Sequence, residues 1–153
     1  MMRPPTVPAP DRSAPLPAPA PPAPLIAEVS VDTSGPALRV ELTLRNGPPG
    51  RGSYLVGLRA GDGGRTTIRH LTVNLRGGRV TSLSTYDFGT STRTLHPRGG
   101  ASCAGMSVTA LFPRASLAGL GEDRCITAYS SLNGQELQTW IPLTRLVTGV
   151  PRA

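Results

Sequence analysis

Residues 125–143 read CITAYSSLNGQELQTWIPL, and this stretch decides the fold class. At its centre, Asn133-Gly134 suits a two-residue hairpin turn, because both residue types accept the positive φ that such a turn needs. The flanking segments, 125–132 and 135–143, are predicted strands. Trp140 is expected on the face opposite Ile141, exposed to solvent. We expect one face to be shared by Ile126, Ala128, Ser130, Leu132, Gln135, Leu137, Thr139 and Ile141.

A second hairpin is predicted upstream, around Gly77-Gly78. Two glycines adopt positive φ at both turn positions without steric cost. Pairing across this turn sets Leu75 opposite Val80 and Arg76 opposite Arg79. The second pair juxtaposes two like charges, which is unfavourable unless solvent or an anion screens them.

The rest of the chain after Leu25 shows the same period of two. Segments 38–44, 54–59, 66–75, 80–88 and 102–112 are predicted strands, while 89–100 is polar and turn-rich. Residues 113–121 are expected to form one short helical turn. No segment sustains a period of 3.6. About eight strands at short intervals predict an all-β chain, an antiparallel β-sandwich of jelly-roll or immunoglobulin-like type, with a small β-barrel as the alternative.

Residues 107–143, with a strand, a turn that begins at Pro113 and the Asn133-Gly134 hairpin, resemble the closing strands of small β-sandwich modules in secreted bacterial proteins. The resemblance implies the sandwich fold and assigns no functional residue.

The chain divides by composition into three parts. Residues 1–24 hold more than half of the 17 prolines. Proline fixes φ and removes a backbone donor, so this part is predicted to be a disordered or extended linker. Residues 25–146 are the predicted β-domain, and residues 147–153 a tail.

The charge balance is basic, with 16 basic and 9 acidic residues and a net charge of +7. Such a balance raises the prospect of an anionic partner. All the basic residues are Arg, however, and they stand singly without aromatic interleaving. A phosphate-binding surface ordinarily mixes Arg with Lys. Dispersed Arg therefore favours a solvated β surface, with nucleic-acid association as a second alternative.

Cys103 and Cys125 are candidates for one disulfide, which implies an oxidising compartment. Free thiols in a reducing compartment are the alternative. The N-terminus opposes export, because proline-rich sequence rather than an apolar segment follows Met1-Met2-Arg3. On the cysteines we expect an extracellular or cell-envelope location, with a virion or the cytoplasm as alternatives. No apolar stretch approaches the ~18 residues of a membrane span.

Residues for chemistry are few. Only His70 and His96 offer a general base, and neither stands in a motif for nucleophilic catalysis. His70, His96, Cys103 and Met106 are the ligand types of a blue-copper site, but the short spacing from Cys103 to Met106 disfavours it. The sequence predicts no catalytic residue, no metal site and no cofactor.

The strongest residue-level signal is aromatic. Tyr54, Tyr86, Phe88, Tyr129 and Trp140 are candidates for a stacking platform. Trp140 and Tyr129, together with Arg76 and Arg79, are the candidate binding surface. We expect a noncatalytic structural or adhesive module of a bacterial envelope, surface assembly or virion that contacts other proteins. A module that binds carbohydrate or another acidic polymer is the first alternative.

Overall fold

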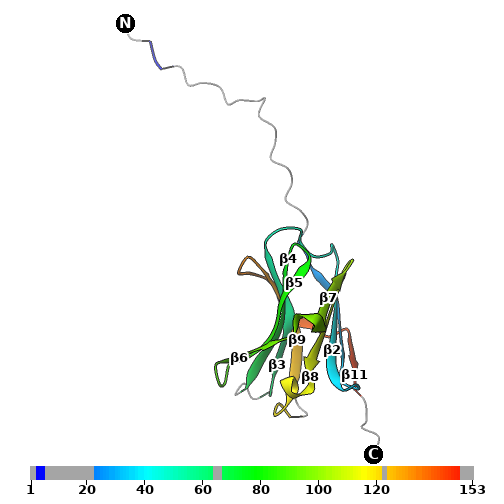
Figure 1. The fold of residues 1–153 in the computed structure, drawn as a ribbon. Coiled ribbons are helices and arrows are strands. Elements are labelled where there is room, and N and C mark those ends of the chain that lie inside the picture. The colour runs from blue at the N-terminus through cyan, green and yellow to red at the C-terminus, as the bar shows by residue number, and fades with distance from the viewer. Residues whose placement is uncertain (1–2, 6–22, 64–66, 122–123, 149–153) are drawn as a thin grey trace, which may run out of the picture.

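The computed structural model describes residues 3–5, 23–63, 67–121 and 124–148. In this part of the chain, eleven strands form two sheets that pack face to face (Figure 1). The five-stranded sheet contains, in spatial order, β11 (Arg145–Val147), β1 (Ile26–Asp32), β2 (Ala37–Leu44), β8 (Ser107–Pro113) and β7 (Ala101–Ala104). The six-stranded sheet contains β10 (Gln135–Pro142), β9 (Cys125–Leu132), β3 (Ser53–Gly61), β4 (Ile68–Arg76), β5 (Arg79–Asp87) and β6 (Thr92–His96).

The predicted all-β sandwich is confirmed. All neighbouring strands are antiparallel except β1 and β11, which run parallel. The barrel alternative is wrong, because each sheet ends in two edge strands that do not pair with the other sheet. Most of the predicted proline-rich leader (residues 6–22) and of the predicted tail (149–153) lies outside the described residues.

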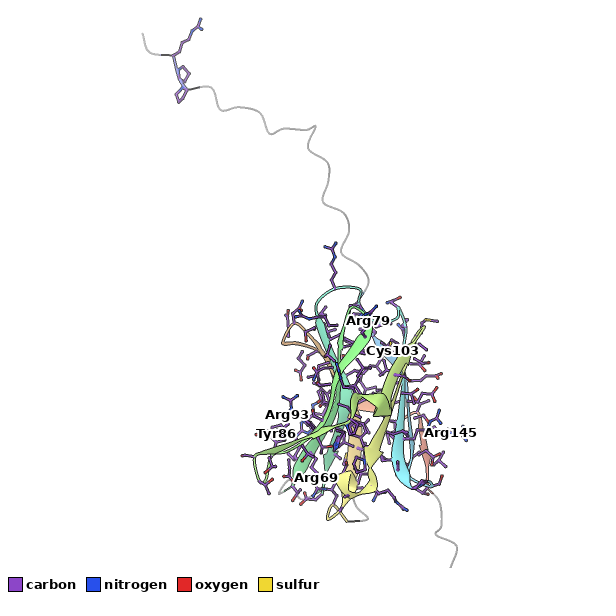
Figure 2. All side chains as sticks on the ribbon, in the orientation of Figure 1. Arg69, Arg79, Tyr86, Arg93, Cys103 and Arg145 are labelled. Carbon is purple, nitrogen blue, oxygen red and sulfur yellow. The ribbon has the colours of Figure 1, made fainter. Side chains whose placement is uncertain are left out.

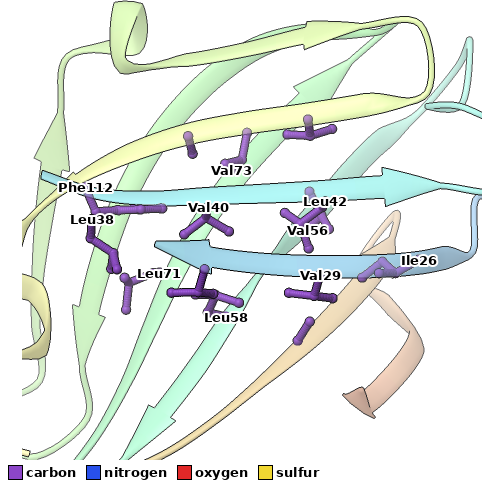
Figure 3. Close-up of a cluster of buried hydrophobic side chains, with 14 of the residues drawn as sticks. Ile26, Val29, Leu38, Val40, Leu42, Val56, Leu58, Leu71, Val73 and Phe112 are labelled. Atoms are coloured by element: carbon purple, nitrogen blue, oxygen red, sulfur yellow. The ribbon is translucent and has the colours of Figure 1, made fainter. Parts of the chain in front are cut away.

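Alternation along the strands builds the core between the sheets. Along β2, alternate side chains from Leu38 to Leu44 are buried, as the sequence predicts. They meet the buried side chains of β3 and β4 from the opposite sheet (Figure 3). The labelled core residues in that view are Ile26, Val29, Leu38, Val40, Leu42, Val56, Leu58, Leu71, Val73 and Phe112.

Both predicted hairpins form. Gly77 and Gly78 have φ of 59° and 75°, and Arg76 pairs with Arg79 in the predicted register. Asn133 and Gly134 have φ of 52° and 80° between β9 and β10. The expected regular alternation along β10 is wrong, because its register with β9 shifts after Glu136 and again after Gln138. Each shift inserts residues that face no partner, so the side-chain pattern no longer has a simple period of two.

Two further segments differ from expectation. The predicted single strand over 102–112 is two strands, because Gly105 (φ 58°) turns the chain between β7 and β8. The segment 89–100, predicted to be turn-rich, contains the edge strand β6. Most side chains of β6 are exposed, so it lacks the buried alternation that marks a strand in sequence. The short helix η2 (Arg114–Leu117) is the predicted helical turn, and η1 (Arg98–Gly100) precedes β7.

The described chain enters and leaves the sandwich at opposite ends (Figure 1). At the entry, the Tyr54 hydroxyl donates a hydrogen bond of 2.9 Å to the carbonyl oxygen of the buried Pro24. At the exit, β11 lies along the end of β1, and the Thr33 N–H donates to the Val147 carbonyl oxygen over 2.8 Å. Tyr54 therefore belongs to the core and not to a stacking platform, which corrects the sequence prediction.

Candidate binding surface

The predicted disulfide between Cys103 and Cys125 is wrong, and both thiols are free. Cys103 lies on β7 in the five-stranded sheet, paired with Val108 at the end where the chain enters. Cys125 lies on β9 in the six-stranded sheet, paired with Gly61 at the other end. The two cysteines therefore belong to different sheets and to opposite ends of the sandwich, so no local movement joins them.

The blue-copper ligand set is not assembled. His70 lies on β4 and points away from the core, whereas His96 lies at the end of β6, its Nε2 2.8 Å from Thr85 Oγ1. Cys103 lies on β7, and Met106 is exposed in the turn that follows. In the described residues no group of three or more His, Cys, Asp or Glu side chains is placed to hold a metal ion.

The predicted binding residues Arg76, Arg79, Tyr129 and Trp140 do not form one surface. Tyr129 pairs with Gly57 on β3. Arg76 and Arg79 pair at the tip of the β4–β5 hairpin, beside Ser53 at the start of β3. Trp140 instead stacks on Arg59, near the other end of β3. Ser53 and Arg59 are six positions apart, about 20 Å along an extended strand. Arg76 and Arg79 are thus separate from the aromatic residues.

The aromatic residues lie on what we call the outer face, the side of the six-stranded sheet that points away from the five-stranded sheet. Its central row runs across β3, β4, β5 and β6 as the paired residues Arg59, His70, Tyr86 and Arg93. Their chain neighbours Leu58, Leu71 and Thr85 point inward and are buried. Tyr86 and Arg93 are visible side by side on this face (Figure 2).

His70 is the centre of an aromatic cluster on the outer face. Its ring centroid lies 4.7 Å from that of Phe88 and 4.6 Å from that of Tyr129. Phe88 in turn meets Tyr86 edge-on at 4.7 Å. Burial lowers the pKa of His70, and the nearby positive charge of Arg59 lowers it further. His70 is therefore neutral at pH 7, which suits a ring packed among aromatic rings.

Gly57 makes room for this cluster. It pairs with Tyr129 on β9 and with Thr72 on β4, so it lies between them on the outer face. The Tyr129 hydroxyl reaches across it to Thr72 Oγ1 at 2.6 Å. Burial raises the pKa of Tyr129 to about 12, although the hydrogen bond with Thr72 acts in the opposite direction. Tyr129, a predicted binding-surface residue, is therefore half-buried and forms the floor of this cluster.

A hollow of about 490 Å³ opens over this floor. Its aromatic walls are Tyr86, Phe88 and Tyr129, with His70 beside them. Its volume falls within the ~300–1,000 Å³ usual for ligand sites. Its lining also includes the polar residues Thr72, Asn74, Ser84, Arg93, Ser130, Ser131 and Glu136. The hollow thus combines flat apolar rings with donors and acceptors.

A second, polar cleft of about 410 Å³ lies below β6, on the inner side of the sheet. Arg69 donates to Asp87 Oδ2 and to the Ser116 carbonyl oxygen, both over 3.1 Å. His96 and Ser116 both approach Thr85 Oγ1, at 2.8 and 3.5 Å. Neither ion pair found among the described residues involves a histidine. Among the described residues of the cleft, His96 is therefore partnered by the Thr85 hydroxyl and not by a carboxylate that would orient it as in a Ser-His-Asp arrangement.

Sequence reasoning missed Arg59 and gave His70 no role in the aromatic group. The detectable signal was period-two alternation along 54–61, which puts Leu55, Gly57, Arg59 and Gly61 on one face. What brings these residues together with Tyr86, Phe88 and Trp140 is strand order, which spans most of the chain.

Comparison with protein-family models, with curated proteins and with solved structures finds no match to this chain. None of the helices in the described residues is long and apolar enough to span a bilayer.

Proposed function

We propose that this chain is a noncatalytic binding module that recognises carbohydrate with the outer face of its six-stranded sheet. The observation that carries the proposal is the hollow above His70, where aromatic rings adjoin hydroxyl, amide and guanidinium groups. This proposal takes up the first alternative from the sequence in preference to assembly through protein contacts.

The chemistry of a sugar matches such a hollow. A pyranose ring presents apolar C–H groups on its faces and hydroxyl groups around its rim, so it needs flat apolar surfaces beside donors and acceptors. Tyr86 and Phe88 supply the surfaces. Asn74 and Arg93 supply the rim contacts. Tyr86, Asn74 and Arg93 stand on strands, and Phe88 directly follows the end of β5, which holds these side chains in fixed positions before a ligand arrives.

Assembly through protein contacts is the second candidate, and β6 favours it. Within the described residues this strand pairs only with β5, so one of its edges is open there. It holds no lysine or proline to discourage another strand from pairing. Leu95 on β6 is 68% exposed. A partner strand added here would bury Leu95 and extend the sheet.

The free cysteines remove the disulfide that first pointed to an oxidising compartment. The proposal of the cell envelope or the extracellular space therefore rests only on the proposed ligands, since glycans and surface assemblies occur there. The proline-rich leader would then serve as the spacer that carries the module. Nucleic-acid association remains a further alternative, and a strong salt dependence of binding would identify it.

A glycan array followed by calorimetry tests the proposed function. Wild-type protein should bind a defined set of saccharides, and Tyr86→Ala should weaken this binding about tenfold or more. Leu111→Ala is the matched control, because Leu111 is 47% exposed and lies on the five-stranded sheet. Absence of saccharide binding by a folded protein would overturn the proposal. Concentration-dependent association that is abolished by a charged substitution at Leu95 would instead establish assembly through β6.

A further inference from the structure

Trp140 occupies an unfavourable backbone conformation. Its φ is 58°, in the left-handed region that bulky residues rarely adopt. It lies within the register shift between Gln138 and Ile141, where β10 carries more residues than its partner β9. Bulges of this kind re-aim side chains and recur next to functional sites. Such strain persists only where the surrounding structure imposes it.

The strain is not offset by burial of the indole. Trp140 is 61% exposed, so the side chain does not cover the end of the core. A large aromatic ring kept in solvent by a strained backbone points to a partner outside the folded chain.

Arg59 holds the indole at one edge of the outer face. Its guanidinium carbon lies 4.3 Å from the centre of the Trp140 ring, within cation–π range. Neither of the ion pairs found in the described part of the chain includes Arg59. A guanidinium that stacks through its face still presents N–H groups at its edge, which can bind a carboxylate in bidentate fashion.

A hollow of about 210 Å³ lies at this place. Gly61 and Gly63 add no side chain to it, and Ile68 gives it an apolar portion. Among the described residues, the lining includes Arg59 and no acidic residue; it consists of Arg59, Gly61, Gly63, Ile68, Cys125, Thr127 and Trp140. The described lining therefore has one positively charged residue, Arg59, and one aromatic wall, Trp140.

We propose that Trp140 and Arg59 form a subsite for an acidic sugar residue. The sugar ring stacks on the indole, and its carboxylate accepts hydrogen bonds from the guanidinium of Arg59. This inference rests on the proposed carbohydrate function and names the chemical class of the ligand, a uronic-acid polymer.

The chain supplies its own reporter, because Trp140 is its single tryptophan. Titration with a galacturonic-acid hexasaccharide should change the fluorescence of wild-type protein. The methyl-esterified hexasaccharide, which lacks the negative charges, should bind about tenfold more weakly. Arg59→Gln should remove this preference for the acid form, whereas Trp140→Phe should keep the preference with reduced affinity.

Trp140→Gly separates a binding role from a structural one. Glycine accepts positive φ, so the variant should be at least as stable as the wild type while binding of the hexasaccharide, measured by calorimetry, falls about tenfold or more. Marked destabilisation by Trp140→Gly would contradict this inference and assign Trp140 to the fold.

Tyr86→Ala distinguishes this inference from the proposed function. If the hexasaccharide binds, and binding is weakened by Tyr86→Ala but unchanged in Trp140→Gly and Arg59→Gln, the subsite is overturned while the proposed function stands. If the folded wild-type protein binds neither the acidic nor the esterified hexasaccharide, the acidic-sugar subsite is also overturned. The proposed carbohydrate function is then decided by the glycan array. Binding of both forms with equal affinity would likewise contradict the role of Arg59.

Discussion

The hydroxyl oxygen of Tyr129 lies 2.6 Å from Oγ1 of Thr72, although a whole strand separates β9 from β4. The contact is possible because Gly57, the residue of β3 between them, has no side chain. This arrangement joins three strands through their outer face and forms the floor of the proposed binding hollow.

Tyr129→Phe should lower the free energy of unfolding at neutral pH by about 1 kcal/mol, because it leaves the largely buried Thr72 hydroxyl without its partner. Urea denaturation measures the loss. Thr81→Val is a suitable control, since its hydroxyl donates to Asn74 in an exposed position. If the two variants lose the same unfolding free energy, burial of the Tyr129–Thr72 pair does not strengthen its contribution to stability.

The same tyrosine predicts a response to alkaline pH. The pKa of Tyr129 is about 12 in the folded protein against 10.0 for a free tyrosine, so folding favours the neutral phenol. The stability from this group is present below pH 10 and is lost as pH rises from 10 toward 12. Denaturation at a series of alkaline pH values should show a smaller loss for Tyr129→Phe than for the wild type. If the wild type and Tyr129→Phe lose stability identically with rising pH, the raised pKa of Tyr129 is contradicted.

Gly57→Ala should be severely destabilising. A methyl group at this position would collide with the carbonyl oxygen of Leu71, and backbone on the neighbouring strand cannot move aside. We expect a loss of more than about 2 kcal/mol, measured by chemical denaturation. Gly50→Ala and Gly99→Ala are matched controls, because an added methyl group at either glycine meets nothing within 4 Å. A Gly57→Ala protein as stable as these controls would show that β3 and β4 are not so closely apposed.

Asp87→Asn should lower the free energy of unfolding at neutral pH, and this loss should be smaller in acid. Desolvation raises the pKa of Asp87, but hydrogen bonds from Arg69, Thr90 and Gly89 outweigh it and hold the pKa below 3.8. A lowered carboxyl pKa gives stability that is present above the unfolded-state value and lost as pH falls through the folded-state value. The difference in unfolding free energy between Asp87→Asn and wild type should therefore shrink below pH 3.8. A constant difference would contradict the ion pair with Arg69.

The histidines predict a loss of stability on mild acidification. Burial lowers the pKa of both His70 and His96, and Arg59 lowers that of His70 further. Their stabilising effect is present above pH 6.5 and is lost as pH falls below it, because the unfolded chain takes up protons first. Unfolding midpoints between about pH 7.5 and about pH 5.5 should fall in the wild type. The fall should be smaller in His70→Gln and smallest in the double variant with His96→Gln.

Features encoded in neighbouring residues were predicted correctly. The two hairpins follow from Gly77-Gly78 and Asn133-Gly134, whose φ values the turns require. The buried side of β2 follows from its alternation. Trp140 is exposed as predicted, but the bulge between Gln138 and Ile141, and not a regular alternation, directs it outward. The edge strand β6 could not be predicted in this way, because only hydrogen bonds to β5 define it.

The disulfide prediction failed for a related reason. Sequence separation alone made Cys103 and Cys125 a plausible pair, but a bond requires that their strands meet. β7 joins the five-stranded sheet and β9 joins the six-stranded sheet. Sheet membership depends on pairing between distant segments, about which the residues near each cysteine carry no information.

The sequence by itself determined that this protein is an all-β sandwich, because alternation and turn chemistry act over a few residues. Only the tertiary structure decided which residues share a surface. Strand order brought Arg59 under Trp140 and His70 between Phe88 and Tyr129, while it moved Arg76 and Arg79 to another end of the sheet. The physical reason is that the order of the strands depends on how all of them together bury the core. The pattern within one strand shows which of its faces is buried but not which strand lies beside it.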